Sequence, residues 1–140
     1  MYSKQAQLAK TSKSKKKTTT SHKKLIKKLD DLVRQIVRLR DTECCCGKRL
    51  EDNMQVSHFV SRRVHALRWD LRNVAGSCPG CNLRHNYDPL PYTRWMLRTW
   101  GKSVMDDLFE AKNKISKLTN SDLEEIKQSL EVELQKLGGK

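Results

Sequence analysis

The sequence predicts a small α+β domain, mostly helical, in which short strands and loops lie between flanking helices. The chain has 140 residues, of which 36% are hydrophobic and 32% are charged, so its core is modest. Five cysteines form two tight groups, at 44–46 and at 78 and 81. An odd number of cysteines in short clusters favours metal binding over disulfides. We therefore expect a bound metal to stabilise the region between the helices.

Residues 1–20 predict a disordered, lysine-rich arm. Ten lysines and no acidic residue lie within residues 1–28, although the net charge of the whole chain is only +13. Such a segment is either a solubilising tail or an arm that lies along phosphates, and both interpretations stay open. For the second, the lysines that would contact a polyanion are Lys13, Lys15, Lys16 and Lys17.

Residues 21–41 predict the first helix, which Ser21 can cap. Its apolar residues recur at helical spacing and end with Ile36, Val37 and Leu39. Residues 92–140 predict the C-terminal helices, beginning near Tyr92, near Ser103 and at Ser121, where Ser-Asp-Leu-Glu is a capping-box pattern. The apolar stripe of the last helix favours packing within the chain, with a dimer seam as the alternative.

No hydrophobic run approaches the ~20 residues that a membrane span requires. The first residues also lack the apolar stretch of a secretory signal. We therefore expect a cytoplasmic protein without a membrane partner.

Residues 42–91 predict the metal-bound core. Cys78-Pro-Gly-Cys81 is one half of a tetrahedral zinc site. In the other half, Cys46 precedes a glycine, as the second cysteine of a zinc knuckle commonly does. Its partner three residues earlier would be position 43, which is glutamate, so we favour Cys44 with Cys46 and keep Cys45 as the alternative. A zinc ion bound by four cysteines has no open position, so any catalysis would need other groups.

Those other groups are His58, Asn73 and Asn82, of which the last directly follows the second cysteine pair. The segments ECCCGK, SHFVSRRVHALRWDLRNVAGSCPGCN and PYTRWMLRTWGKSVMDDL resemble the HNH, or ββα-metal, nucleases. Within them the chain is most similar to the phage NinG/Rap recombination endonucleases, over roughly residues 25–137. The resemblance implies a zinc-stabilised ββα-metal core that cleaves branched DNA such as Holliday junctions or D-loops in the host cytoplasm.

The resemblance also implies residue roles. His58 would be the general base, Asn73 would hold its ring, and Asn82 would bind a catalytic Mg²⁺ or Mn²⁺. One position departs from the pattern, because HNH nucleases usually have a metal-binding aspartate where this chain has Ser57. Phosphate oxygens and water would then complete the metal site, or Ser57 itself or another nearby group would help; the other candidates are Gln55, Asp52 and His65.

DNA binding is expected from basic residues around these positions. Arginine side chains hold phosphates without reading sequence, which suits recognition of branched DNA by its shape. The expected contacts are Arg62, Arg63, His65, Arg68, Arg72, Arg84 and His85. Cutting both strands of a junction needs two active sites, so we expect a homodimer. Two alternatives remain open: an HNH nickase or endonuclease on linear duplex, and a zinc-stabilised DNA-binding module without catalysis.

Overall fold

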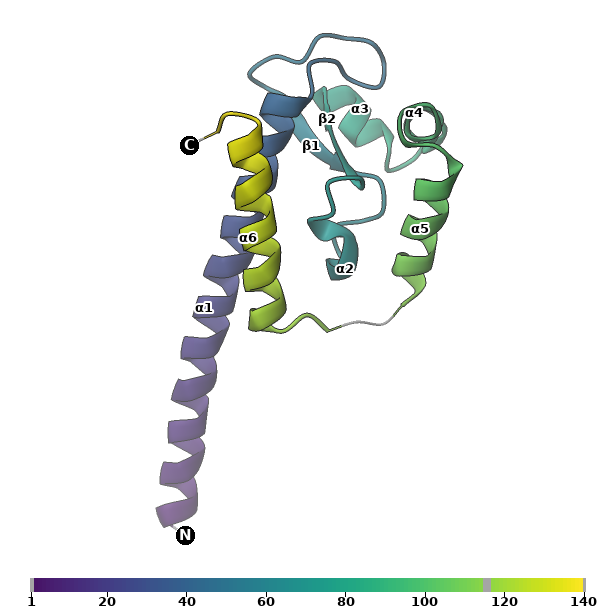
Figure 1. Cartoon of the computed structure of the whole chain (residues 1–140). Coiled ribbons are helices and arrows are strands. Elements are labelled where there is room, and N and C mark those ends of the chain that lie inside the picture. The colour runs from purple at the N-terminus through teal and green to yellow at the C-terminus, as the bar shows by residue number, and fades with distance from the viewer. Residues whose placement is uncertain (1, 115–116, 140) are drawn as a thin grey trace.

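The structure is a computed structural model that describes the backbone of residues 2–114 and 117–139 and the side chains of residues 21–114 and 117–139. A long helix runs along one side, a small sheet lies in the middle, and shorter helices surround the sheet (Figure 1). The elements in chain order are α1 (Tyr2–Arg40), β1 (Gln55–His58), α2 (His65–Arg68), β2 (Val74–Ser77), α3 (Pro79–Arg84), α4 (Leu90–Trp100), α5 (Lys102–Asn113) and α6 (Asn120–Lys136). The predicted class, α+β and mostly helical, is confirmed.

The sheet consists of two antiparallel strands, with Gln55 of β1 opposite Ser77 of β2 and His58 opposite Val74. All four residues of β2 are buried, so helices cover both faces of this strand. Helix α3 begins directly after β2, with Cys78 as its N-cap and Pro79 in its first turn. This connection places the second cysteine pair at the end of the sheet.

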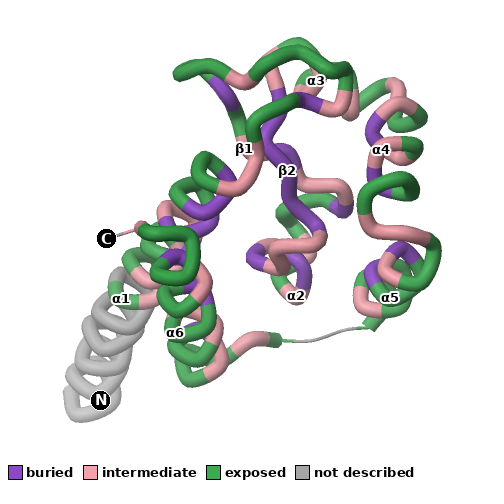
Figure 2. The backbone as a smooth tube through the Cα atoms, turned by 45° about the horizontal axis from the view of Figure 1, so that its top comes forward, coloured by how far each residue is buried: buried purple, intermediate pink, exposed green. Residues whose placement is uncertain are grey.

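Two hydrophobic cores lie on the two sides of the sheet (Figure 2). The first joins α1 and α6 to the sheet; its buried residues are Leu29, Leu32, Val33, Ile36, Val37, Met54, Trp69, Val74, Leu123, Leu130 and Leu134. The second joins α4 and α5 to the sheet; its buried residues are Val60, Leu67, Ala75, Tyr92, Met96, Met105 and Leu108. The sheet and the α2 loop are therefore held between two helix pairs.

Helix α1 differs from the sequence expectation at its beginning. We predicted a disordered arm over 1–20 and a helix capped by Ser21, whereas the helical backbone is continuous from Tyr2. Neither glycine nor proline occurs in residues 2–40, and lysine, glutamine and alanine favour helix, so no residue there stops the helix. The side chains of Lys13, Lys15, Lys16 and Lys17 lie outside the described residues. Over the described part of the chain, neither α1 nor any other helix is long and apolar enough to cross a membrane.

The cap of α6 also differs from the prediction. We placed a capping box at Ser121, but the helix begins at Asn120 and its box is formed by Thr119 and Asp122. The Asp122 backbone N–H donates to Thr119 Oγ1 at 3.1 Å, and the Thr119 N–H donates to the Asp122 carboxylate at 2.8 Å. Leu123, Leu130 and Leu134 then pack on α1, so the apolar stripe of α6 is a packing face within one chain.

Candidate functional site: a cysteine cluster beside a histidine cleft

Four cysteines converge where the first turn after α1 meets the start of α3. The Sγ atoms of Cys44, Cys46, Cys78 and Cys81 all lie within 4.8 Å of one another. The Sγ atoms of Cys44 and Cys78 are 3.7 Å apart, close to the ~3.8 Å edge of a tetrahedron with Zn–S bonds of about 2.3 Å. These four thiols can hold a zinc ion. They are the set that the sequence favours, and Cys45 is outside it.

A tight turn brings Cys44 and Cys46 to the same side of the chain. Glu43 and Arg49 form an isolated bridge, the Cys44 N–H donates to the Lys48 carbonyl at 2.8 Å, and the Gly47 N–H donates to the Cys44 carbonyl at 2.8 Å. Gly47 has φ 87°, a conformation that other residues rarely adopt. This glycine therefore lets the chain reverse directly after Cys46.

Backbone N–H groups donate to two of the four sulfurs, but the surroundings favour the thiolate form only at Cys78. The Cys81 N–H donates to the Cys78 sulfur and lowers the pKa of that thiol to about 7, whereas burial raises the pKa of Cys44 to about 11. The Cys78 N–H in turn donates to Cys44 Sγ at 3.3 Å. Burial also raises the pKa of Cys81, so Cys78 is the thiol that ionises most readily, and a metal would displace the remaining protons on binding.

His58 ends β1 and is half-buried, and its ring is held by the backbone of α2. The Nε2 atom lies 3.0 Å from the carbonyl oxygen of Arg68. A carbonyl can only accept, so Nε2 carries the hydrogen and Nδ1 keeps its lone pair. Burial lowers the pKa of His58 below 6.5, although the hydrogen bond to Arg68 opposes this shift. The imidazole is therefore neutral near pH 7, with Nδ1 able to accept a proton.

Asn73 does not hold the His58 ring, which corrects the role implied by the resemblance. It is fully buried, its Oδ1 accepts from the Val60 N–H at 2.8 Å, and its Nδ2 donates to the carbonyls of Val60 and Leu67, both at 3.0 Å. The amide thus satisfies three backbone groups, two of Val60 in the loop after β1 and one of Leu67 in α2. Because α2 also carries the Arg68 carbonyl, Asn73 acts on His58 only through the backbone of α2.

Asn82 points to the side chains that precede His58 on β1. Its Oδ1 accepts from Ser57 Oγ at 2.6 Å, and its Nδ2 donates to Gln55 Oε1 at 2.7 Å. Ser57 is fully buried and also bonds Ser77 Oγ. The oxygens gathered here are amide and hydroxyl oxygens without charge. They suit a hard cation in type, but give it no carboxylate.

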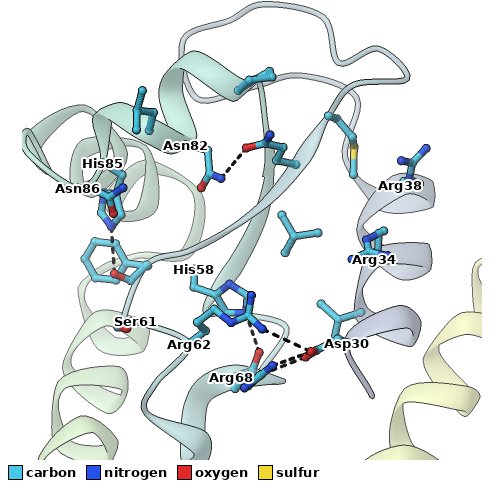
Figure 3. A pocket seen from close by; sticks show the side chains of 17 residues that line it. Asp30, Arg34, Arg38, His58, Ser61, Arg62, Arg68, Asn82, His85 and Asn86 are labelled. Carbon is cyan, nitrogen blue, oxygen red and sulfur yellow. Dashed lines mark hydrogen bonds and ion pairs between the residues drawn. The ribbon is translucent and has the colours of Figure 1, made fainter. Parts of the chain in front are cut away.

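An open cleft of about 970 Å³ brings these groups together with the end of α1. Asn82, His85 and Asn86 lie on its α3 side and Arg34 and Arg38 on its α1 side (Figure 3). His58 and Arg62 lie between the two sides, with Asp30 and Arg68 at one end. The contribution of α1 to this cleft was not predicted from the sequence, because the apolar spacing of that helix indicates only its packing face.

Arg68 is a structural residue rather than a free phosphate ligand. Its guanidinium donates to both carboxylate oxygens of Asp30, at 3.0 and 2.6 Å, and only 12% of its side chain is exposed. Trp69 Nε1 donates to the same carboxylate at 2.9 Å, and Arg62 lies 3.7 Å from it with 63% of its side chain exposed. Arg62 is therefore the predicted arginine that the cleft leaves accessible.

Arg63, His65, Arg72 and Arg84, which were also predicted to contact DNA, do not line the cleft. Arg72 pairs with Asp70 at 2.9 Å and with Asp107 at 3.5 Å, and Arg84 pairs with Asp88 at 3.1 Å. Arg63 and His65 line a separate hollow beside α5, which leaves His65 away from the proposed catalytic metal site.

His85 does line the cleft, but its ring packs against Tyr92, with centroids 4.7 Å apart. Its Nε2 donates to the Phe59 carbonyl at 3.1 Å, and its Nδ1 is buried without a hydrogen bond to any described residue. The ring therefore offers the cleft little polar surface.

The comparisons with known proteins identify the family. No curated protein and no solved structure matches the chain. The model of the NinG family, described as bacteriophage lambda NinG protein, matches residues 2–139. This match includes the cysteine turns, His58, Asn82 and all of the helices around them, so the chain belongs to the NinG family of phage proteins.

Proposed function

We propose that this NinG protein is a metal-dependent DNA endonuclease of the HNH, or ββα-metal, type. The observation that carries the proposal is the state of His58: a neutral ring, fixed through Nε2–H by the Arg68 carbonyl, that lines an arginine-rich cleft with its lone pair on Nδ1. A positioned base near neutral pH is what phosphodiester hydrolysis by water requires. The β1–β2–α3 order with a cysteine cluster beside it is consistent with the ββα-metal arrangement.

The chain's own residues would divide the reaction as follows. His58 Nδ1 accepts a proton from the attacking water. The Arg68 carbonyl then stabilises the resulting imidazolium through Nε2–H. Arg62 binds a phosphate oxygen and holds the scissile strand in the cleft. Zinc, bound by the four cysteines, would fix the first turn and the start of α3 in place.

Asn82 and Gln55 are the residues that would hold a catalytic Mg²⁺ or Mn²⁺ through their side-chain oxygens, and the ion would replace the bond from Asn82 Nδ2 to Gln55 Oε1. Such an ion supplies neutralisation of the phosphate charge and of the leaving oxygen. Ser57 already donates to Asn82 Oδ1 and thereby orients the amide toward β1. Because both side-chain oxygens are uncharged, the DNA phosphate would have to supply the negative charge at this site.

We propose branched DNA as the substrate and a homodimer as the active form, on the basis of family membership and of the two cuts that a junction requires. Since the apolar stripe of α6 packs on α1, a dimer would use a surface other than that stripe. The mass of the protein bound to a four-way junction tests this proposal, and a single copy per junction would contradict it.

The test of the enzyme proposal compares wild type, His58→Ala and His22→Ala on labelled four-way, three-way, flap and linear DNA. His22 is the matched control, because its ring bonds Asn120 on α6 and does not line the cleft. Reactions contain Mg²⁺, Mn²⁺ or EDTA. We expect metal-dependent cutting of branched DNA by wild type and His22→Ala, and a loss of about 10²–10⁴-fold in His58→Ala with binding retained. Equal cutting of linear duplex would instead indicate an HNH nickase or endonuclease.

A second candidate function is a zinc-stabilised DNA-binding module without catalysis. It is favoured by one observation, namely that Ser57 is buried and bonded where a carboxylate would otherwise stand beside Asn82. If the protein is such a module, wild type and His58→Ala should both bind branched DNA in the same experiment, and neither should cut it. Restoration of cutting by Ser57→Asp would then identify the missing carboxylate as the reason.

A further inference from the structure

We propose that one face of α1 is a phosphate-binding ridge that holds a duplex arm leaving the cleft. The ridge consists of Lys23, Lys27, Arg34 and Arg38, whose spacings of four, seven and four residues place them on one side of the helix. All four are exposed. The proposal rests on the proposed function in taking DNA as the partner.

The opposite side of α1 explains why the ridge stays accessible. Leu29, Leu32, Val33, Ile36 and Val37 are buried against α6 and the sheet, so the helix is fixed along one face and free along the other. Figure 1 shows α1 continuing beyond the body of the molecule toward the N-terminus. A ridge on a helix anchored in the core is a rigid surface for a stiff duplex.

The ridge begins inside the cleft. Arg34 and Arg38 line the same hollow as His58 and Asn82, and face it from the α1 side (Figure 3). A strand bound at His58 would therefore pass these two guanidinium groups as it leaves. Lys27 and Lys23 then lie farther along the helix in the direction of the N-terminus.

The acidic residues near the ridge do not cancel its charge. Asp30 shares this side of α1, but its carboxylate is taken by Arg68 and Trp69. Asp31 pairs with Arg34 at 3.3 Å, with 40% and 58% of the two side chains exposed. An exposed pair of this kind contributes only about 0–1 kcal/mol, so a phosphate can replace Asp31.

The remaining three cations of the ridge are more loosely held. Arg38 donates only to the backbone carbonyl of Asp52, at 3.5 Å, within the described part of the chain. Lys23 and Lys27 form no ion pair with any residue whose side chain is described. All three can therefore turn toward a phosphate without breaking a strong contact.

The length of the ridge predicts the length of DNA that it protects. From position 23 to position 38 the helix rises roughly 22 Å, at about 1.5 Å per residue. This length corresponds to roughly 6–7 base pairs at about 3.4 Å per pair. The ridge would thus bind about half a turn of one arm, beginning at the cleft.

The first experiment measures binding to a four-way junction in EDTA at several salt concentrations, so that cleavage plays no part. It compares wild type, Arg34→Gln/Arg38→Gln, Lys23→Gln/Lys27→Gln and a matched control, Arg94→Gln/Arg98→Gln. The control removes the same charge from exposed positions of α4 that do not line the cleft. Circular dichroism establishes that each variant keeps the wild-type helix content.

We expect each ridge variant to bind the junction more weakly. The slope of log binding constant against log salt concentration should become smaller in magnitude by up to ~1.8, because each lost phosphate contact contributes ~0.9. The control should keep the wild-type slope. Hydroxyl-radical footprinting should show protection of one arm over about 6–7 base pairs, of which Lys23→Gln/Lys27→Gln loses the outer part.

Equal salt slopes for the ridge variants and wild type would overturn the ridge proposal. So would a loss of affinity in the α4 control as large as that in the ridge variants. A wild-type protein that does not bind the junction would overturn the ridge and the proposed function together. Ridge-dependent binding without any cleavage in Mg²⁺ or Mn²⁺ would support the ridge and contradict the nuclease. The two proposals therefore fail in distinguishable ways.

Discussion

The orientation of His58 depends on a backbone carbonyl rather than on another side chain. Arg68 supplies that carbonyl from α2, Asn73 bonds the Leu67 carbonyl of the same helix, and Asp30 holds the Arg68 side chain from α1. Only Arg68 contacts the ring, and the other two residues act on it through α2. The resemblance to HNH nucleases implied a direct bond from Asn73 to His58, but sequence order does not tell which way a buried amide points.

The lowered pKa of His58 gives a prediction for pH dependence. Burial favours the neutral ring, so protonation should require a pH below the ordinary value of 6.5. As pH falls through this lowered pKa the base is lost, and single-turnover cleavage should fall up to tenfold per pH unit while staying flat above about pH 7. Titration of the imidazole by NMR checks the pKa independently of activity. A midpoint above 6.5 would contradict the burial argument.

Asp30→Asn tests how far the Asp30 carboxylate stabilises the fold and influences the pKa of His58. Burial alone would raise the pKa of Asp30, but hydrogen bonds from Arg68 and Trp69 and the charges of Arg68 and Arg62 lower it below 3.8. The carboxylate therefore stabilises the fold above the unfolded pKa, and this contribution is lost as pH falls through the folded pKa.

In Asp30→Asn we expect a loss of about 1–2 kcal/mol in unfolding free energy at pH 7, between the values for exposed and buried pairs. The pKa of His58 should fall further, because the negative charge of Asp30 favours the imidazolium. Asp31→Asn is the control, since its pair with Arg34 is more exposed. Equal His58 titration in Asp30→Asn and wild type would show that Asp30 has no influence on the base.

Among the elements, the cysteine turns were the most predictable and the helix ends the least. The two cysteine groups and Gly47 indicated a tetrahedral site because ligand spacing and a positive φ are local requirements. The cap of α6 was placed two residues late, since Thr119-x-x-Asp122 and Ser121-x-x-Glu124 are both capping patterns. The cleft side of α1 could not be predicted, because it depends on how that helix meets β1 and α3.

Removal of zinc should unfold the region around the cysteine turns. Cys46 is exposed, so replacing it should lower the stability strongly only if its thiolate holds a bound ion. We expect Cys46→Ser or a strong chelator to lower the melting temperature by roughly 10 °C, or about 2–3 kcal/mol for a domain of this size. Cys45→Ser, outside the cluster, should melt like wild type and bind one zinc ion per chain. Equal melting of both variants would mean that the cluster is not a structural zinc site.

The molecule as a whole depends on α1, which contributes to the first core and to one side of the cleft. Helix α6 is the other half of that core, although it lies far from α1 in the sequence and contributes no residue to the cleft. Amphipathic spacing predicted a packing face on each helix, but not that the two faces meet. The C-terminal helix therefore supports the candidate site from a distance.

Leu130→Ala tests this dependence, with Val132→Ala on the same helix as its control. Leu130 is 3% exposed in the first core, whereas Val132 is 51% exposed. Removing three buried carbons should lower the unfolding free energy by about 2–4 kcal/mol in urea, against less than about 0.5 kcal/mol for the control. If α1 is held mainly by α6, hydrogen exchange in α1 should accelerate in Leu130→Ala more than exchange in α4 and α5. Uniform acceleration across all three helices would instead mean that the two cores unfold as one unit, and that the cleft is no more sensitive to α6 than the rest of the fold.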